Sequence, residues 1–162
     1  MLVWGHFILW YNKPMDELIN AIKVLLADTV ALKYKAQGYH WNVESDDFKP
    51  WHSFFGEIYE DLSESEDDIA EWIRILYGYA PFKLSRFMEL STIAETEVSS
   101  DPMMMAQDLY NAIETYKMKF VELADMAMPA KEYALANYLN ERQGAMQKFC
   151  WQLRASLKDV GE

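Results

Sequence analysis

The chain has 162 residues, of which 51% are hydrophobic, and its formal net charge is -11. This composition excludes a disordered chain, and the length suits one domain with a sizeable core. The negative charge disfavours non-specific binding to nucleic acid or to an anionic membrane, and it favours the collection of cations.

The first stretch of the chain, residues 1–10, is apolar and aromatic. It has neither a basic n-region nor a small-residue cleavage site, so it does not read as a signal peptide. No apolar run approaches the length needed to span a bilayer. We expect residues 1–13 to form an apolar extension, ordered or packed against a partner, and residues 14–162 to form the folded domain. Cys150 is the only cysteine, which excludes an intrachain disulfide and makes the cytoplasm the expected compartment.

The first predicted helix begins near Pro14 and runs to about Tyr39. Pro14 with Asp16 and Glu17 resembles a first helical turn, because proline suits that position and acids favour the positive end of the helix dipole. Apolar residues then recur at helical spacing: Ile19, Ile22, Leu26 and Val30.

The second predicted helix covers residues 48–77. Asp46 or Asp47 can cap it, Pro50 suits its first turn, and Gly78 is a natural stop. Its broad apolar surface comprises Trp51, Phe54, Phe55, Ile58, Leu62, Ile69, Trp72, Ile73 and Leu76.

Three further helices complete the prediction: a short one over residues 84–90 and two long ones. Asp101 and Pro102 read as the cap and first residue of a helix with strict four-three apolar spacing. Pro129 ends that helix and can open the last one. The fold class is therefore all-α, a four-helix bundle with a short helix in the long link that carries the chain across the bundle.

Four side chains form the candidate metal site: His40, His52, Asp67 and Glu71. Imidazole nitrogen and carboxylate oxygen both suit iron, and Asp67 and Glu71 are four residues apart, so they share one helix face. Along a single helix, however, His52 and Asp67 are separated by about 22 Å at 1.5 Å per residue. One ion cannot span that distance. Either the four residues are not a site, or two copies of the chain build it together.

Two interpretations stay open on spacing alone. An acidic run on a helix is usually a solvated face, and a histidine at a helix end is often a cap or a packing residue. Alternatively, the helix packs antiparallel against its copy about a two-fold axis near Asp61 or Leu62, with Ile58 near the axis. Position 52 of one chain is then level with position 71 of the other, which creates two identical sites per dimer. A diiron site inside one bundle needs Glu-x-x-His pairs, and the sequence has none.

Several motifs together resemble the Dps family of ferritin-like mini-ferritins, specifically over residues 14–95. They are Leu25-Leu26-Ala27-Asp28, His40-Trp41-Asn42-Val43, Phe48, His52, Asp67, Ile69-Ala70-Glu71, Ile73-Arg74, Leu76, Ala80-Pro81, Leu84 and Glu89-Leu90-Ser91. The resemblance implies a hollow shell of twelve four-helix subunits that oxidises Fe(II), preferentially with hydrogen peroxide, and stores the ferric product. It also implies a ferroxidase centre at a dimer interface, with His40 and His52 from one chain and Asp67 and Glu71 from the partner.

The resemblance adds secondary candidates. Glu60 and Glu64 share a helix stripe with Asp67 and Glu71 and are candidates for ferric mineral nucleation if they face a cavity. Glu57 and Asp61 are weaker candidates, and a solvated surface is the alternative for all four. Glu114 aligns with an acid of the family's iron entry pore, and Asp108 is its neighbouring alternative. Trp41 and Trp51 flank the histidines, either as interceptors of oxidant or as interface packing.

Two departures from the family pattern concern the second iron and DNA. The family commonly has an acid four residues after the second histidine, where this chain has Gly56. Members that bind DNA often use a lysine-rich tail, whereas Lys13 is the only lysine in the first fifteen residues.

Three functions therefore compete. The leading one is an iron-storing ferroxidase that protects against oxidative stress. The others are a DNA-compacting Dps-like shell with vestigial oxidation, and a plain structural bundle that pairs with itself.

Overall fold

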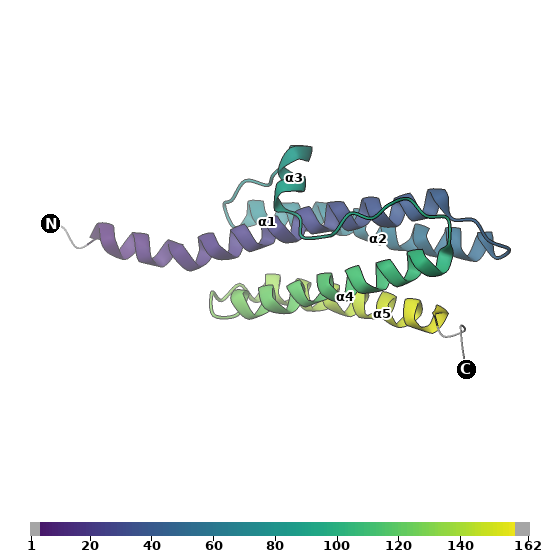
Figure 1. Cartoon of the computed structure of the whole chain (residues 1–162). Helices are drawn as coiled ribbons and strands as arrows, with labels where there is room; N and C mark the ends of the chain where they lie inside the picture. The colour runs from purple at the N-terminus through teal and green to yellow at the C-terminus, as the bar shows by residue number, and fades with distance from the viewer. Residues whose placement is uncertain (1–3, 158–162) are drawn as a thin grey trace.

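The computed structural model describes the backbone of residues 4–157 and the side chains of residues 13–157. Five helices cover this part of the chain, and no strand occurs in it: α1 (Trp4–Asn42), α2 (Phe48–Ile75), α3 (Leu84–Leu90), α4 (Pro102–Ala127) and α5 (Tyr133–Ser156). The antiparallel pair α1 and α2 lies against the pair α4 and α5, and the link that contains α3 runs back along α1 to reach α4 (Figure 1). The predicted all-α bundle with a short helix in the link is confirmed.

The start of α1 differs from its prediction. The helix begins at Trp4, so Pro14 lies inside it and not in its first turn. Proline removes one backbone hydrogen bond from a helix interior, which is why sequence rules place it at helix starts. The side chains of residues 1–12 and the backbone of residues 1–3 lie outside the described residues, and the division of the chain at residue 14 stays a prediction. At its other end α1 continues past Tyr39 to Asn42, which puts His40 in its last turn.

The predicted α4 cap and α2 stop are present, with one change of detail. Asp101 accepts hydrogen bonds from the backbone N–H groups of Met103 and Met104, as an N-cap should. At the end of α2 the left-handed residue is Tyr77, with φ 65°, rather than Gly78. The N–H of Gly78 closes the turn on the Ile73 carbonyl at 2.9 Å. A Cβ at Gly78 would come 2.7 Å from Cγ2 of Ile19, so close approach requires the glycine.

The helix boundaries around α2 and α5 refine two other expectations. Asp47 is the N-cap residue of α2 but makes no side-chain capping bond. Its own N–H donates to the Ser45 hydroxyl. Pro129 ends α4, yet α5 begins only at Tyr133, so this proline does not open the last helix.

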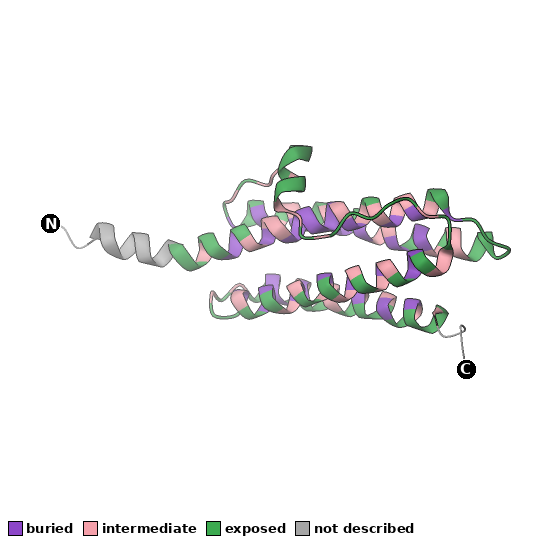
Figure 2. Ribbon diagram, viewed as in Figure 1, coloured by how far each residue is buried: buried purple, intermediate pink, exposed green. Residues whose placement is uncertain are grey.

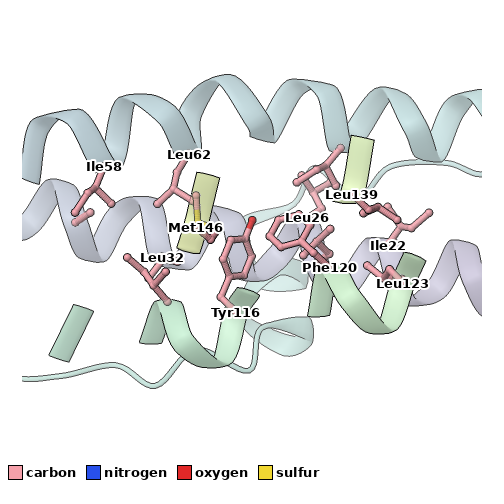
Figure 3. Packing of buried hydrophobic residues seen from close by; sticks show 14 of the residues in the cluster. Ile22, Leu26, Leu32, Ile58, Leu62, Tyr116, Phe120, Leu123, Leu139 and Met146 are labelled. Atoms are coloured by element: carbon pink, nitrogen blue, oxygen red, sulfur yellow. The ribbon is translucent and has the colours of Figure 1, made fainter. Parts of the chain in front are cut away.

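The core runs along the axis of the bundle, where the buried side chains of the long helices face one another (Figures 2 and 3). Figure 3 shows Ile58 and Leu62 of α2 pointing at this core, and both side chains have no exposed surface. The sequence predicts that these two residues lie near a two-fold axis between copies. That prediction is wrong for their side chains, because both are buried inside the single chain. The hydroxyls of Tyr116 and Thr29 satisfy each other inside the core at 2.6 Å.

The crossing link is tied to α1 by a buried carboxylate. Asp28 has no exposed surface, and it accepts hydrogen bonds from the Ser91 hydroxyl at 3.0 Å and from the N–H of Thr92 at 2.5 Å. Lys119 of α4 lies 3.0 Å from the same carboxylate. A buried charge needs such partners, so Asp28 fixes both the link and α4 against α1.

None of the helices over residues 4–157 is long and apolar enough to cross a membrane.

Candidate metal centre

His40 and His52 come together where α1 ends and α2 begins. Their rings are stacked, with centroids 3.6 Å apart and planes inclined by 24°. Both side chains are half-buried. The chain reverses direction between the end of α1 and the start of α2, so a short sequence separation becomes a direct contact.

Each histidine is held by the backbone of the other. Nδ1 of His40 lies 2.6 Å from the carbonyl oxygen of His52, and Nδ1 of His52 lies 2.7 Å from the carbonyl oxygen of His40. A carbonyl oxygen can only accept, so both Nδ1 atoms carry the proton and donate it. In the neutral rings the lone pair is then on Nε2, which is the nitrogen available to a metal. The chain therefore fixes the tautomer of both candidate ligands.

Two aromatic residues of α2, Phe48 and Tyr59, enclose this pair. The Phe48 ring stacks on His52 at 4.9 Å, and the Tyr59 ring meets His40 edge-on at 5.2 Å. Gly56 lies between them on the same face. Trp51, expected to flank the site, stacks instead on Phe55 at 5.6 Å, and Trp41 is 64% exposed.

The two candidate carboxylates lie elsewhere. Asp67 and Glu71 are exposed on the second half of α2. The helix is unbroken from Phe48 to Ile75, so Asp67 lies about 22 Å along the axis from His52, and Glu71 lies farther away. Among the residues whose side chains are described, no group of three or more potential ligands lies close enough to hold a metal ion. One chain brings the two histidines together and does not bring the carboxylates to them.

The other acids of α2 divide into free and paired groups. Glu57, Glu60 and Glu64 are exposed, whereas Asp61 forms an ion pair with Arg142 of α5. The exposed acids leave an accessible negative face along α2 between its two ends.

The acid considered for an entry pore, Glu114, is partly neutralised within the chain. It lies 2.7 Å from Nζ of Lys117, and hydrogen bonding to Lys117 holds the pKa of its carboxyl below the usual range.

Burial, together with the adjacent Glu114, raises the pKa of the Cys150 thiol to about 12. The thiol therefore stays protonated and unreactive at neutral pH.

Asp108, the alternative to Glu114, is bonded to two residues of α1 through one carboxylate oxygen. Its carboxylate accepts a hydrogen bond from the Tyr39 hydroxyl at 2.6 Å and pairs with Lys35 at 2.5 Å. Burial and the neighbouring Asp108 raise the pKa of Tyr39 to about 12. Tyr39 directly precedes His40, so this cluster anchors the end of α1 that carries the first histidine. Sequence reasoning missed it, because its members come from α1 and α4, which are far apart in the chain.

Comparison with known proteins gives a consistent picture. A family model described as a ferritin-like domain matches residues 19–161. A DNA protection during starvation protein from Helicobacter pylori is 31% identical over 84% of this chain and 95% of its own length. A low temperature-induced protein of Nostoc is 29% identical over 91% of this chain and 83% of its own length. Among solved structures, a Dps protein of Vibrio cholerae, described as a member of a superfamily of ferritin-like diiron-carboxylate proteins, superimposes with a TM-score of 0.87 at 26% identity, covering 91% of this chain and 92% of that one.

Proposed function

Because this chain belongs to the Dps family of ferritin-like proteins, we propose that it is an iron-storage mini-ferritin that oxidises Fe(II) at sites shared between two subunits. The observation that carries the proposal is the His40–His52 pair, whose Nδ1 atoms are both committed to carbonyl oxygens. Two neutral imidazoles with free Nε2 atoms are suitable ligands for Fe(II). The proposed site takes His40 and His52 from one subunit and Asp67 and Glu71 from its partner.

The register of the dimer follows from the lengths along α2. An antiparallel pairing that sets residue 52 opposite residue 71 also sets Phe48 opposite Ile75. Both of these apolar side chains are exposed in the single chain, at 43% and 56%. Covering them with each other removes apolar surface from water, which supports the same register as the ligands. A two-fold axis repeats the arrangement, so each dimer has two sites.

In the proposed reaction Fe(II) is the substrate and hydrogen peroxide the oxidant. Two Fe(II) each give up one electron, the O–O bond of peroxide breaks, and two protons are taken up to form two molecules of water. Releasing both electrons to one peroxide avoids hydroxyl radical. The chain's own contribution is to hold neutral imidazole at one side and carboxylate at the other, so that the ligand set carries the negative charge that favours the ferric product.

The proposal extends to storage. We propose that the dimers assemble into a dodecameric shell whose interior receives the ferric product, in a reducing cytoplasm, where it protects against oxidative stress. Glu57, Glu60 and Glu64 are exposed acids that are available to nucleate mineral. Glu114 is a weaker pore candidate than the sequence suggested, because Lys117 pairs with it.

DNA compaction finds less support. The Helicobacter relative carries DNA protection in its name, but the net charge of this chain is -11 and Lys13 is the only lysine or arginine in its first fifteen residues. Affinity for DNA depends on neutralising phosphates with basic side chains. We therefore do not extend DNA protection to this chain.

The shared site is tested by complementation between two inactive variants. One carries His40→Ala with His52→Ala, and the other carries Asp67→Asn with Glu71→Gln. Each pure shell should lose peroxide-driven Fe(II) oxidation. In a mixed dimer, one of the two sites receives wild-type histidines and wild-type carboxylates. Random pairing in an equal mixture makes about half of the dimers mixed, so the refolded shells should recover about a quarter of the wild-type rate.

The control is the histidine double variant refolded alone under the same conditions, which should stay inactive. Sedimentation of every sample checks that shells form. A lack of recovery in mixed shells that do form would contradict the shared site. Wild-type activity in the histidine double variant would contradict the assignment of His40 and His52 as ligands, and absence of Fe(II) oxidation in the wild type would contradict the ferroxidase function.

A further inference from the structure

Tyr77, just past the end of α2, is unfavourable in the single chain for two separate reasons. Its backbone φ is 65°, a left-handed conformation that glycine adopts freely and that a bulky residue adopts only with strain. Its side chain is 95% exposed, the largest fraction among the exposed large hydrophobic side chains of the described residues. A glycine would close the same turn without strain, so the turn itself gives no reason for an aromatic ring.

Two comparisons within the chain set Tyr77 apart. Lys131, with φ 63°, is the only other non-glycine residue of positive φ in the described part of the chain, and its exposed side chain is charged and suits water. Tyr79 is also exposed, but the guanidinium of Arg74 lies 4.3 Å from the centroid of its ring. Backbone strain of this kind collects at functional sites, and exposed aromatic rings are typical of interfaces. Tyr77 therefore calls for a partner that covers its ring.

The proposed dimer brings such a partner to Tyr77. The register that sets residue 52 opposite residue 71 also sets residue 77 level with residue 46, because the two helices run antiparallel. The partner's Phe48 is two positions farther along, about 3 Å at 1.5 Å per residue. In the single chain the Phe48 ring is 43% exposed and stacks on His52 at 4.9 Å. A ring that packs on Phe48 thus also shields the histidine behind it.

We propose that Tyr77 packs against the partner's Phe48 and closes the Fe(II) site that the two subunits share. Each chain then gives its partner's histidines both the carboxylates and, six residues after Glu71, an aromatic cover. The apolar surroundings of a metal site control the access of solvent to it, so this cover strengthens metal binding without contact between Tyr77 and the metal. The inference rests on the proposed shared site and names a further residue that the partner contributes to it.

The first test is nitration of Tyr77 by tetranitromethane in the wild-type shell without iron, followed by mass spectrometry of its peptide. A covered ring reacts only when the interface opens, so nitration should be at least about 10-fold slower in the shell than in the urea-unfolded chain. The exposure of 95% in the single chain predicts nearly equal rates instead. Equal rates would overturn the proposal.

The second test adds Tyr77→Gly to one subunit at a time in the mixed shells described above. The complete site of a mixed dimer takes its histidines from the carboxylate-substituted chain and its carboxylates from the histidine-substituted chain. Tyr77→Gly on the histidine-substituted chain removes the cover of this site and should lower its Co(II) affinity about 10-fold. On the carboxylate-substituted chain the same change should leave the affinity as it was. Visible absorption of bound Co(II), without oxidant, measures both.

Two further variants serve as controls. Lys131→Gly relieves the same kind of backbone strain in the turn between α4 and α5, and it should leave Co(II) affinity unchanged on either chain. Tyr77→Phe keeps the ring and should keep the wild-type affinity. Equal losses from Tyr77→Gly in both placements would indicate a general structural effect and overturn the proposal, as would no loss in either. If Tyr77→Gly chains form no shell, nitration of the wild type decides alone.

Failure of the proposed function has a different signature. Mixed shells with the native Tyr77 on both chains would then show no complete site and no recovery of Fe(II) oxidation, and the cover would fall with the site. If those shells recover while Tyr77 is nitrated as fast as in the unfolded chain, the shared site stands and only the role of Tyr77 is wrong.

Discussion

The candidate ligands at the two ends of α2 differ in burial and in hydrogen bonding. At the first end His52 is half-buried, stacked on His40 and hydrogen-bonded to the backbone of α1. At the other end Asp67 and Glu71 are exposed. A neutral imidazole can be buried cheaply once a carbonyl satisfies its N–H, whereas a carboxylate without a partner is costly to remove from water. The fold of one chain therefore orients the neutral ligands and leaves the charged ones in solvent.

The largest expected effect tests whether Asp67 and Glu71, at the exposed end of α2, contribute to Fe(II) oxidation but not to stability. Asp67→Asn with Glu71→Gln should lower the rate of peroxide-driven Fe(II) oxidation at least 100-fold, because the second half of the ligand set is lost. In the absence of iron it should change the free energy of unfolding by no more than about 0.5 kcal/mol, since both side chains are exposed in the single chain. Stopped-flow oxidation and urea unfolding measure the two quantities.

His52→Ala is the companion variant for this comparison. It should lower both quantities, because it removes a ligand and also the donor to the His40 carbonyl, at a cost of about 1 kcal/mol. If the carboxylate variant were as destabilised as His52→Ala, the two ends of α2 would not differ in the way proposed.

An intermediate effect is expected for the contacts of Tyr39 and Lys35 with Asp108, which hold the end of α1 that carries His40. Tyr39→Phe removes the hydrogen bond to Asp108 and should lower the free energy of unfolding by about 1–2 kcal/mol. The rate of Fe(II) oxidation at saturating iron should stay within about twofold of wild type, because Lys35 still pairs with Asp108 and the ring of Tyr39 is retained.

The same variant has a pH signature. The pKa of Tyr39 is raised to about 12, so the native state holds the phenol proton more tightly than the unfolded chain, where tyrosine titrates near 10. The stability gained from this proton is fully present below about pH 10 and is lost as the pH rises toward 12. Urea unfolding between pH 8 and 11 should show a shallower decline for Tyr39→Phe than for wild type. Tyr133→Phe, at an exposed tyrosine, should keep the wild-type slope, and an unchanged slope in Tyr39→Phe would contradict the assignment.

The smallest expected effect lies between the two ends of α2. Glu60→Gln with Glu64→Gln should leave the initial oxidation rate within about twofold of wild type, because these exposed acids are not in the proposed ligand set. Growth of the ferric core, followed by light absorption over minutes, should be slower if they nucleate mineral. An initial rate that falls as far as in the Asp67 and Glu71 variant would place them at the oxidation site and remove the distinction.

Much of the architecture could be predicted because it depends on short-range rules. The apolar spacing of the helices, the Asp101 cap and the short helix over residues 84–90 all follow from neighbours within a few positions, and the structure confirms them. The boundary at Pro14 was wrong for the same reason, since a preference for helix starts is a local tendency that the rest of the chain can override. Ile58 and Leu62 were expected near a two-fold axis between copies, and the structure instead buries both in the core of the single chain, because apolar spacing within one helix does not say which neighbour covers it.

By itself, the sequence determined the candidate ligands and the fact that one chain cannot join them, because the rise of a helix converts fifteen positions into about 22 Å. Only the tertiary structure decided how those ligands are held. The turn after α1 brings the two imidazoles within hydrogen-bonding distance of each other's backbone, and it sets His40 against Gly56. Such contacts depend on how two helices meet, which no spacing within either helix specifies. The four side chains were readable from the chain, while the tautomer and the room for the His40 ring came from packing.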